Sequence, residues 1–341
     1  MNDSQHTDAS GTAPADRGPL AVPLRRDHQT AAAPSAATIE RYDIAHHTTF
    51  TYSAPVTLDQ LVVRLQPSTG VDQRLVHFSI ELDPTPARQT TALDLHGNVR
   101  HWFWFEHSHT RLDLTTRSTV DCFCANPFDY IIIDPGVGQL PACYQQPVHD
   151  ATEHYRRRPD PHPEIDELTR RLIDEHNGST VAFLGGLTHY INQCVEQVVR
   201  PEGDPWSPTE TLHSGQAACR DTAVLFMDVA RTAGLAARFV SGYAYDALDP
   251  SRRELHAWAE VYLPGAGWRG FDPAVGLATA NRHVAVAGSP TPSYAAPTSG
   301  TFTAPPSKPP SPIASTWNNK PSKPPPSPTA RSISGAEPQP S

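Results

Sequence analysis

The chain lacks three features that would each assign it to a class of protein. It lacks a basic excess: 27 Lys and Arg stand against 36 Asp and Glu, a formal net charge of -9, whereas nucleic-acid binding needs a basic surface. It lacks an apolar run of membrane-spanning length, and its polar first residues lack the pattern of a signal peptide. We therefore expect a cytoplasmic protein that binds neither nucleic acid nor a membrane.

Cysteine is also scarce, with five in 341 residues. They are too few and too scattered for a disulfide scaffold, and an odd number leaves at least one thiol free. Cys122 and Cys124 could begin a metal site, but no His or Cys follows at zinc spacing. On a strand the two would share one face, so packing is the favoured interpretation. We predict no metal and no cofactor.

Proline, by contrast, is abundant, with 36 residues that are concentrated toward the C-terminus. Residues 303–341 form a Pro/Ser/Lys-rich tail, which we predict to be a disordered spacer; a ligand for a proline-recognising partner is the alternative. Residues 1–38 are rich in Ala, Ser, Asp and Pro without periodicity. They are predicted to be disordered as well.

The sequence between these ends predicts three regions. Segments rich in Val, Ile, Thr and aromatics, separated by Pro, Gly and Asn, fill residues 39–126 and predict an antiparallel β-sandwich. Within it, Asp94–Asn98 is expected to be a glycine-containing turn between two strands. Residues 127–162 are predicted to be an irregular connector, and residues 163–302 a core of helices followed by strands.

Three helices are expected in the core. Apolar spacing predicts one in "PEIDELTRRLIDEHNG" and a second in "STVAFLGGLTHYINQCVEQVVR", which Ser179 or Thr180 would open. The third, in "GQAACRDTAVLFMDVARTAG", is apolar on nearly every side and should be buried. "LAARFVSGYAY", "ELHAWAEVYLP" and "WRGFDP" follow as strands of one antiparallel sheet. The predicted fold class is therefore α+β.

Cys219 stands at the start of the third helix. There the unpaired N–H groups and the positive end of the helix dipole stabilise a thiolate, and the same N–H groups could donate to an oxyanion. A free cysteine is nevertheless more often a buried, inert residue. The position alone leaves both interpretations open, a nucleophile or a small core residue.

His256 lies on the second predicted strand of the sheet. Strand alternation puts it on the face of Trp258 and Glu260, opposite the aliphatic residues, where it is free to point at a cysteine. A solvent-facing histidine is the alternative.

Asp272 could orient the imidazole of His256, as the acid of a catalytic triad does. Pairing Leu263 with Trp268 across the turn would place Asp272 opposite Ala259, on the wrong face. A one-residue shift at the glycines of that turn would place it opposite Trp258 and diagonal to His256. The triad therefore requires the shifted register.

These segments resemble a known family. "GQAACRDTAVLFMDVARTAGLAARFVSGY" and "LHAWAEVYLPGAGWRGFDPAVGL" resemble the core of bacterial transglutaminase-like proteins, and residues 42–120 resemble the β-rich domain that precedes it. The resemblance implies a papain-like core in which a helix bearing the cysteine packs on an antiparallel sheet. It also implies a catalytic triad at Cys219 in C-R-D, His256 in H-A-W-A-E and Asp272 in F-D-P.

The chain departs from the family pattern at four places. Ala217-Ala218 precede the cysteine where Gly-Val or Gly-Ser is common, and Ala274 follows Asp-Pro in place of threonine. Gly288-Ser289-Pro290 stands where the family has a Gly-Arg-Asp-Tyr-like segment, and Val199-Arg200 where an aromatic often lies. None of these changes removes a triad residue.

Two classes of function follow. In the first, Cys219 attacks a carboxamide or peptide carbonyl, His256 protonates the leaving amine, and the thioester passes to an amine or to water. The protein is then a transglutaminase-like acyltransferase, or a cysteine protease or amidase, with a protein or peptide as substrate. In the second, it is a non-catalytic protein-binding module. Metal binding at His256 lacks the required ligand spacing.

Overall fold

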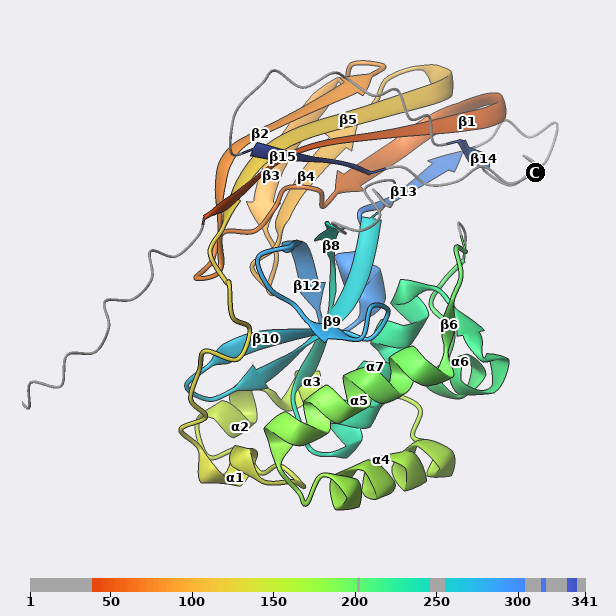
Figure 1. The fold of residues 1–341 in the computed structure, drawn as a ribbon. Coiled ribbons are helices and arrows are strands. Elements are labelled where there is room, and N and C mark those ends of the chain that lie inside the picture. Colours follow the sequence, from red (N-terminus) through yellow and green to blue (C-terminus); the bar gives the residue numbers. More distant parts are fainter. Residues whose placement is uncertain (1–38, 201–202, 246–254, 304–313, 317–329, 336–341) are drawn as a thin grey trace, which may run out of the picture. The chain divides into compact units, whose positions relative to one another are not determined.

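The computed structural model describes residues 39–200, 203–245, 255–303, 314–316 and 330–335. Within these ranges the chain forms an eight-stranded sheet, a five-stranded sheet accompanied by helices, and a short two-stranded pair (Figure 1). The fold belongs to the α+β class, as predicted. The segment 1–38, predicted to be disordered, lies outside the described residues.

The eight-stranded sheet takes five strands from the N-terminal part of the chain. Its order is β2-β5-β1-β4-β3, and every pairing among these five is antiparallel. The predicted turn at Asp94–Asn98 joins β3 to β4, with Gly97 at a positive φ of 80°. The strands are β1 (Glu40–Val63), β2 (Gln73–Asp83), β3 (Arg88–Leu93), β4 (Val99–Trp104) and β5 (Ser108–Cys122).

Strand β1 joins the two halves of this sheet, the β2-β5 pair on one side and the β4-β3 pair on the other. Its first part pairs with β5, and its last residues pair with β4. Side chains from both halves, including Val63, Phe103 and Leu114, meet in one apolar core. The β architecture predicted for residues 39–126 is therefore one continuous hydrogen-bonded sheet around its own core.

Three later segments extend the same sheet by pairing with β1. They are β13 (Thr298–Thr303) and β14 (Ala314–Thr316), both antiparallel, and β15 (Ala330–Gly335), which is parallel. The sequence predicts residues 298–302 as the end of the core. They join the N-terminal sheet because Phe302 packs against its apolar core, 5.2 Å from the ring of Tyr52. Strands β14 and β15 fall within the predicted tail, and its other residues after Thr303 lie outside the described part.

The five-stranded sheet has the order β11-β10-β9-β8-β12, all antiparallel. Strands β8, β9 and β10 are the three predicted from sequence, and β11 and β12 were not foreseen. Asp272 on β10 and His283 on β12 touch although two strands separate them in the sheet order, so the sheet is strongly curled. The strands are β8 (Ala237–Ala244), β9 (Leu255–Leu263), β10 (Gly267–Asp272), β11 (Leu277–Ala278) and β12 (His283–Ser289).

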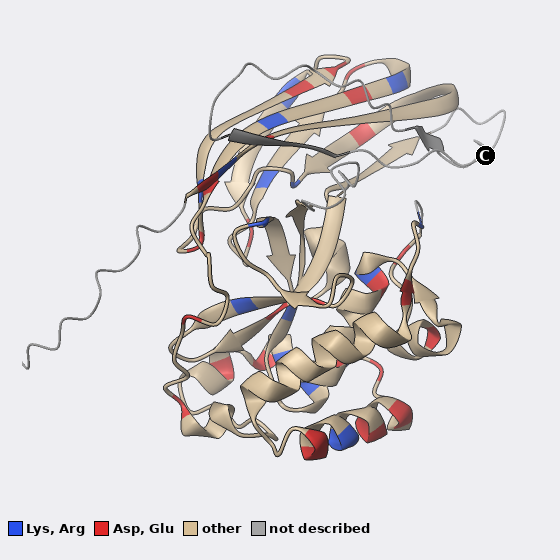
Figure 2. Ribbon diagram, viewed as in Figure 1, with Lys and Arg blue, Asp and Glu red and all other residues tan. Residues whose placement is uncertain are grey.

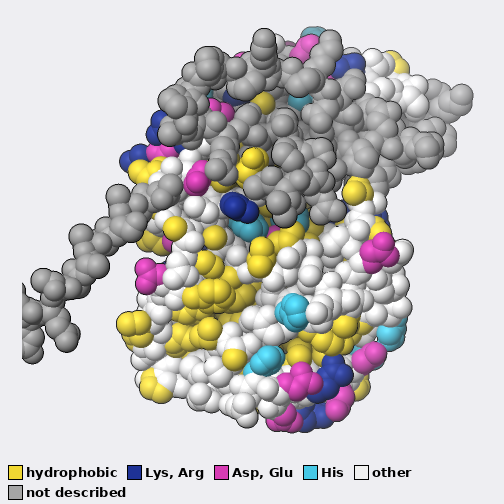
Figure 3. Space-filling model, viewed as in Figure 1, with side chains coloured by type: hydrophobic (Ala, Val, Ile, Leu, Met, Phe, Trp, Pro, Cys, Tyr) yellow, Lys and Arg dark blue, Asp and Glu magenta, His cyan; other side chains and the backbone are white. Residues whose placement is uncertain are grey.

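Helix α7 (Cys219–Thr232) packs against β8 and β9, and its residues Leu225, Phe226 and Val229 are fully buried. Helix α4 (Pro163–Glu175) is amphipathic, and its outer face carries charged side chains (Figures 2 and 3). Both helices were predicted. Shorter elements complete the core: α1 (Pro135–Gly138), α2 (Val148–Ala151), α3 (Glu153–Arg156), α6 (Pro208–Ser214) and a 3-10 turn, η1 (Pro292–Ala295).

Helix α5 (Thr180–Cys194) follows Ser179 at its N-cap, as predicted, but it ends before the predicted Arg200. The backbone after it forms β6 (Glu196–Gln197), which pairs in parallel with β7 (Gln216–Ala217). These hydrogen bonds replace the helical ones and bring residues 196–198 beside the segment that leads into Cys219. Among the described residues, no helix has the length and apolar character needed to cross a membrane.

Candidate active site

Cys219 is the first residue of α7 and is partly exposed. The carbonyl of Ala218, the N-cap residue, accepts the N–H groups of Asp221 and Thr222 at 2.9 and 3.2 Å. The helix therefore begins at the residue before the cysteine, and the thiol lies at the positive end of the helix dipole. This is the position predicted from the sequence.

Asp221 fixes that helix start and was missed as a functional residue. Its carboxylate is fully buried and accepts the N–H of Ala218 and the N–H of Trp206, both at 2.9 Å. It also forms an ion pair with Arg200, whose guanidinium lies 4.7 Å from the centre of the Trp206 ring. The Asp of the C-R-D motif thus holds the Trp206 loop beside Cys219, and that motif was the available signal.

The pairing of β9 with β10 has the shifted register that the triad requires. Leu263 lies opposite Gly267, not Trp268, and Phe271 lies opposite Ala259. The intervening turn places Gly265 and Gly267 at φ values of 92° and 77°, which favour glycine. The next position along β10 is Asp272, which therefore lies on the face of β9 that carries His256.

His256 and Asp272 form a close buried pair. His256 Nε2 lies 2.6 Å from Asp272 Oδ2, and the carboxylate is fully buried. Burial disfavours the imidazolium, but the negative charges and hydrogen bonds of Asp272 and Cys219 outweigh it and hold the pKa of His256 well above its usual value. Burial likewise opposes the carboxylate, yet His256 and His283 lower the pKa of Asp272. The structure thus brings together all three residues singled out in the sequence.

His283, on β12, is a further residue of the site that the sequence analysis did not identify. Its Nε2 lies 3.0 Å from the same Oδ2 of Asp272, and its ring meets Trp258 edge-on at 5.3 Å. The other carboxylate oxygen accepts the N–H of Ala274 at 3.1 Å. Because a carboxylate only accepts, both histidines direct an N–H at it, which leaves Nδ1 of His256 for Cys219.

Cys219 and His256 open onto one cleft of about 660 Å³. We call it the Cys219 cleft. Its lining is mainly apolar and includes Trp206, Phe239 and Leu255, while residues 291–293 and 295–297 form one wall. A concave, largely apolar surface beside a reactive group is typical of a substrate site.

None of the other four cysteines lines the Cys219 cleft. All five are free thiols. Cys122 is buried at the end of β5, and burial raises its pKa to about 12, whereas Cys143 and Cys194 are exposed. In the described part of the chain, no three His, Cys, Asp or Glu side chains are grouped to hold a metal ion.

Cys219 at a helix start thus lies at one cleft with His256, which contacts the buried Asp272 of the antiparallel sheet. Residues 168–273 match the family model of the transglutaminase-like superfamily, and residues 42–121 match that of the bacterial transglutaminase-like N-terminal region. The chain belongs to the transglutaminase-like superfamily and carries the N-terminal region of its bacterial members.

Similar proteins come from several bacteria. An uncharacterized protein of Mycobacterium tuberculosis is 28% identical over 262 residues, covering 72% of this chain and 82% of the relative. One of Mycobacterium leprae is 22% identical over 261 residues, covering 72% and 87%. A crystal structure from Cytophaga hutchinsonii, described provisionally as a cysteine protease, is 19% identical with a TM-score of 0.59, covering 82% of this chain and 90% of that one. The last likeness supports the fold alone.

Proposed function

We propose that the protein is a cysteine enzyme that transfers an acyl group from a carboxamide or peptide bond to an amine or to water. The observation that supports this most directly is the 2.6 Å contact between His256 and the buried Asp272, at a cleft that also exposes Cys219. The raised pKa of His256 favours the imidazolium that a thiolate nucleophile needs beside it.

In the proposed reaction the Cys219 sulfur attacks the carbonyl carbon, and the oxyanion accepts the N–H of Cys219 at the start of α7. The C–N bond then breaks, the imidazolium of His256 gives its proton to the leaving ammonia or amine, and a thioester remains. The neutral imidazole next takes a proton from the attacking amine or water. Collapse of the second intermediate releases Cys219 as thiolate, and Asp272 keeps the ring oriented throughout.

The acceptor decides between two activities. With an amine as acceptor the protein is an acyltransferase that acts on protein or peptide glutamine, and with water it is a protease or amidase. A non-catalytic binding module on the same fold is the opposing hypothesis. Such a module would have no need of a buried aspartate that holds a histidine against a helix-terminal cysteine.

The test follows the acyl-enzyme directly. Wild-type protein is incubated with a glutaminyl peptide, and intact mass is read before and after addition of a primary amine. We expect an acyl adduct on Cys219 that disappears with formation of amide or acid. Cys219→Ala should show neither, while Cys143→Ser, which removes an exposed thiol that does not line the cleft, should behave as wild type. No adduct and no product from the wild-type protein on glutaminyl or peptide-bond substrates would favour the binding module.

A further inference from the structure

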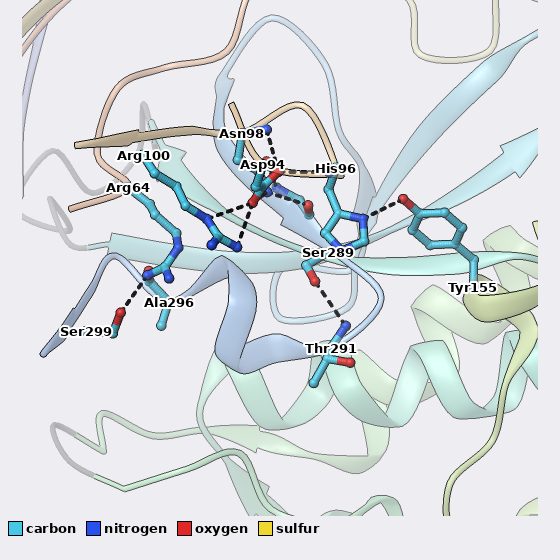
Figure 4. Close-up of polar contacts among 11 residues, drawn as sticks. Arg64, Asp94, His96, Asn98, Arg100, Tyr155, Ser289, Thr291, Ala296 and Ser299 are labelled. Carbon is cyan, nitrogen blue, oxygen red and sulfur yellow. Dashed lines mark hydrogen bonds and ion pairs between the residues drawn. The ribbon is translucent and has the colours of Figure 1, made fainter. Parts of the chain in front are cut away.

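One wall of the Cys219 cleft is held in place by the N-terminal sheet. Residues 291–297 connect β12 to β13, and six of them line the cleft. At the start of this connection, Asn98 and Gly288 exchange two hydrogen bonds of 2.9 and 2.8 Å. At its end, Arg64 Nη1 donates to the carbonyl of Ala296 at 3.1 Å and to Ser299 Oγ at 3.0 Å (Figure 4). The wall is thus fixed at both ends by residues outside the core.

Hydrogen bonds from the rest of the protein decide which backbone groups of the wall are free to bind a substrate. The carbonyl of Ala295 accepts from Ser241 Oγ at 2.7 Å, that of Ala296 from the Arg64 side chain, and that of Pro297 from the Arg64 N–H at 2.7 Å. Pro292 and Pro297 have no N–H to offer. Three consecutive carbonyls are therefore already hydrogen-bonded within the protein. Strand-like pairing with a peptide would need free backbone groups, so contact with apolar side chains is favoured instead.

The lack of charge in the wall itself agrees with a preference for apolar side chains. Residues 291–297 include no Asp, Glu, Lys, Arg or His, and Phe239 and Leu255 line the same cleft. The charged residues that line the cleft, Asp160, Asp204 and Arg220, belong to other segments. Arg64, which bonds to the carbonyls of Ala296 and Pro297 in the wall, is 5% exposed. Arg64 therefore holds the wall in its conformation and does not itself line the cleft.

We propose that the 291–297 wall receives an apolar side chain of the acyl donor, next to the reactive carbonyl, and that Arg64 is the positioning residue that sets this preference. The proposal rests on the proposed function, since it assigns the substrate class of the same cleft. Arg64 takes no part in the chemistry. It determines which donors reach Cys219 and not how fast a bound donor reacts.

The probes are peptidyl chloromethyl ketones that carry leucine, glycine or aspartate next to the electrophile, and the measurement is the second-order rate of Cys219 alkylation by intact mass. We expect wild-type protein to prefer leucine over aspartate roughly ten- to a hundredfold, the range that apolar pockets achieve. Arg64→Lys and Arg64→Gln should lose most of this ratio while iodoacetamide, which needs no wall, still alkylates Cys219 at the wild-type rate. Arg111→Gln, an exposed arginine of the same sheet paired with Asp113, is the matched control and should keep the preference.

Each result decides between the hypotheses. Equal rates for the three probes in wild-type protein, or no labelling of Cys219 by any of them, would overturn the proposal, and so would an unchanged preference in both Arg64 variants with native melting curves. Two substitutions are used because a buried arginine can be needed for folding, and Arg64→Lys retains the charge. Alkylation requires no turnover. A clear leucine preference without transferase or hydrolase activity would therefore refute the proposed function and leave intact only the assignment of the wall as a site for an apolar side chain.

Discussion

Replacing Asp272 with asparagine tests the role of the buried carboxylate. The carboxylate accepts from His256 and His283 at one oxygen and from the N–H of Ala274 at the other. Asparagine has only one acceptor oxygen. If that oxygen faces the histidines, the amide NH2 opposes the N–H of Ala274; if the amide is flipped, NH2 opposes both histidines.

Either orientation leaves at least one buried donor without an acceptor. The expected loss in unfolding free energy is about 1–3 kcal/mol, the cost of one unsatisfied buried group. The loss of the negative charge also lowers the pKa of His256, because Asp272 is the strongest group that raises it. General acid-base catalysis contributes roughly 10²- to 10⁴-fold, so kcat/KM should fall by an amount in that range.

The pH dependence gives a second readout of Asp272→Asn. The pKa of His256 is raised in the folded protein, so its contribution to stability is complete below the unfolded value and is lost as pH rises through the folded value. The pKa of Asp272 is lowered, so its contribution is present above the unfolded value and is lost as pH falls through the folded value. Asp272→Asn should therefore reduce the change of the unfolding free energy with pH at both acid and alkaline pH. It should also move the alkaline limit of activity to lower pH.

The assay combines denaturant unfolding from acid to alkaline pH with the rate of Cys219 alkylation over the same range. Asp113→Asn is the control, since Asp113 pairs with the exposed Arg111 on the N-terminal sheet. Because water screens the exposed Arg111, Asp113→Asn should leave the alkylation profile of Cys219 unchanged. If Asp272→Asn kept the wild-type alkylation profile and stability, the carboxylate would have no hold on His256, and our interpretation of the site would be wrong.

Three further changes test the surroundings of the site. His283→Phe removes a hydrogen bond to the Asp272 carboxylate, and denaturant unfolding should show a loss of about 1.5–3 kcal/mol; unchanged stability would contradict the contact. Asp221→Asn breaks a buried ion pair at the helix start and should cost about 3 kcal/mol and slow Cys219 alkylation, whereas a wild-type alkylation rate would show that the helix start is held otherwise. Iodoacetamide at neutral pH should label Cys219 first and Cys122 only after unfolding, because burial raises the Cys122 pKa to about 12; peptide mapping that finds early Cys122 adducts would disprove this.

The sequence predicted the parts of the site that depend on local patterns. A helix boundary made Cys219 a candidate and strand alternation made His256 one, but each pattern left a structural interpretation open. The resemblance to the transglutaminase-like family joined them with Asp272 as an expected triad. A triad with Asp272 required a shifted turn that two glycines allow, and the register of β9 and β10 confirms that shift. Each of these signals extends over a few residues only, where backbone preferences act strongly.

The parts that the sequence analysis missed depend on contacts between separate elements, which local patterns do not describe. His283 reaches Asp272 only because the sheet curls, and no periodicity reports curl. Helix α5 ends early because residues 196–197 pair with residues 216–217, and this pairing outweighs the helix propensity of the segment. The final residues of the predicted core join β1 because Phe302 finds an apolar partner there, a preference that one sequence does not reveal.

The pairing of β1 with β13 also has a consequence for how the protein is made. Val63 emerges early from the ribosome, but its partner Thr298 follows only when nearly all of the described chain has been synthesised. At typical translation speeds the delay is on the order of ten seconds or more. During that time this part of β1 lacks its β13 neighbour, and an unpaired strand edge is a site of aggregation. A chaperone that covers this edge until translation ends would prevent such aggregation. Chains released before Thr298 should be the ones that aggregate.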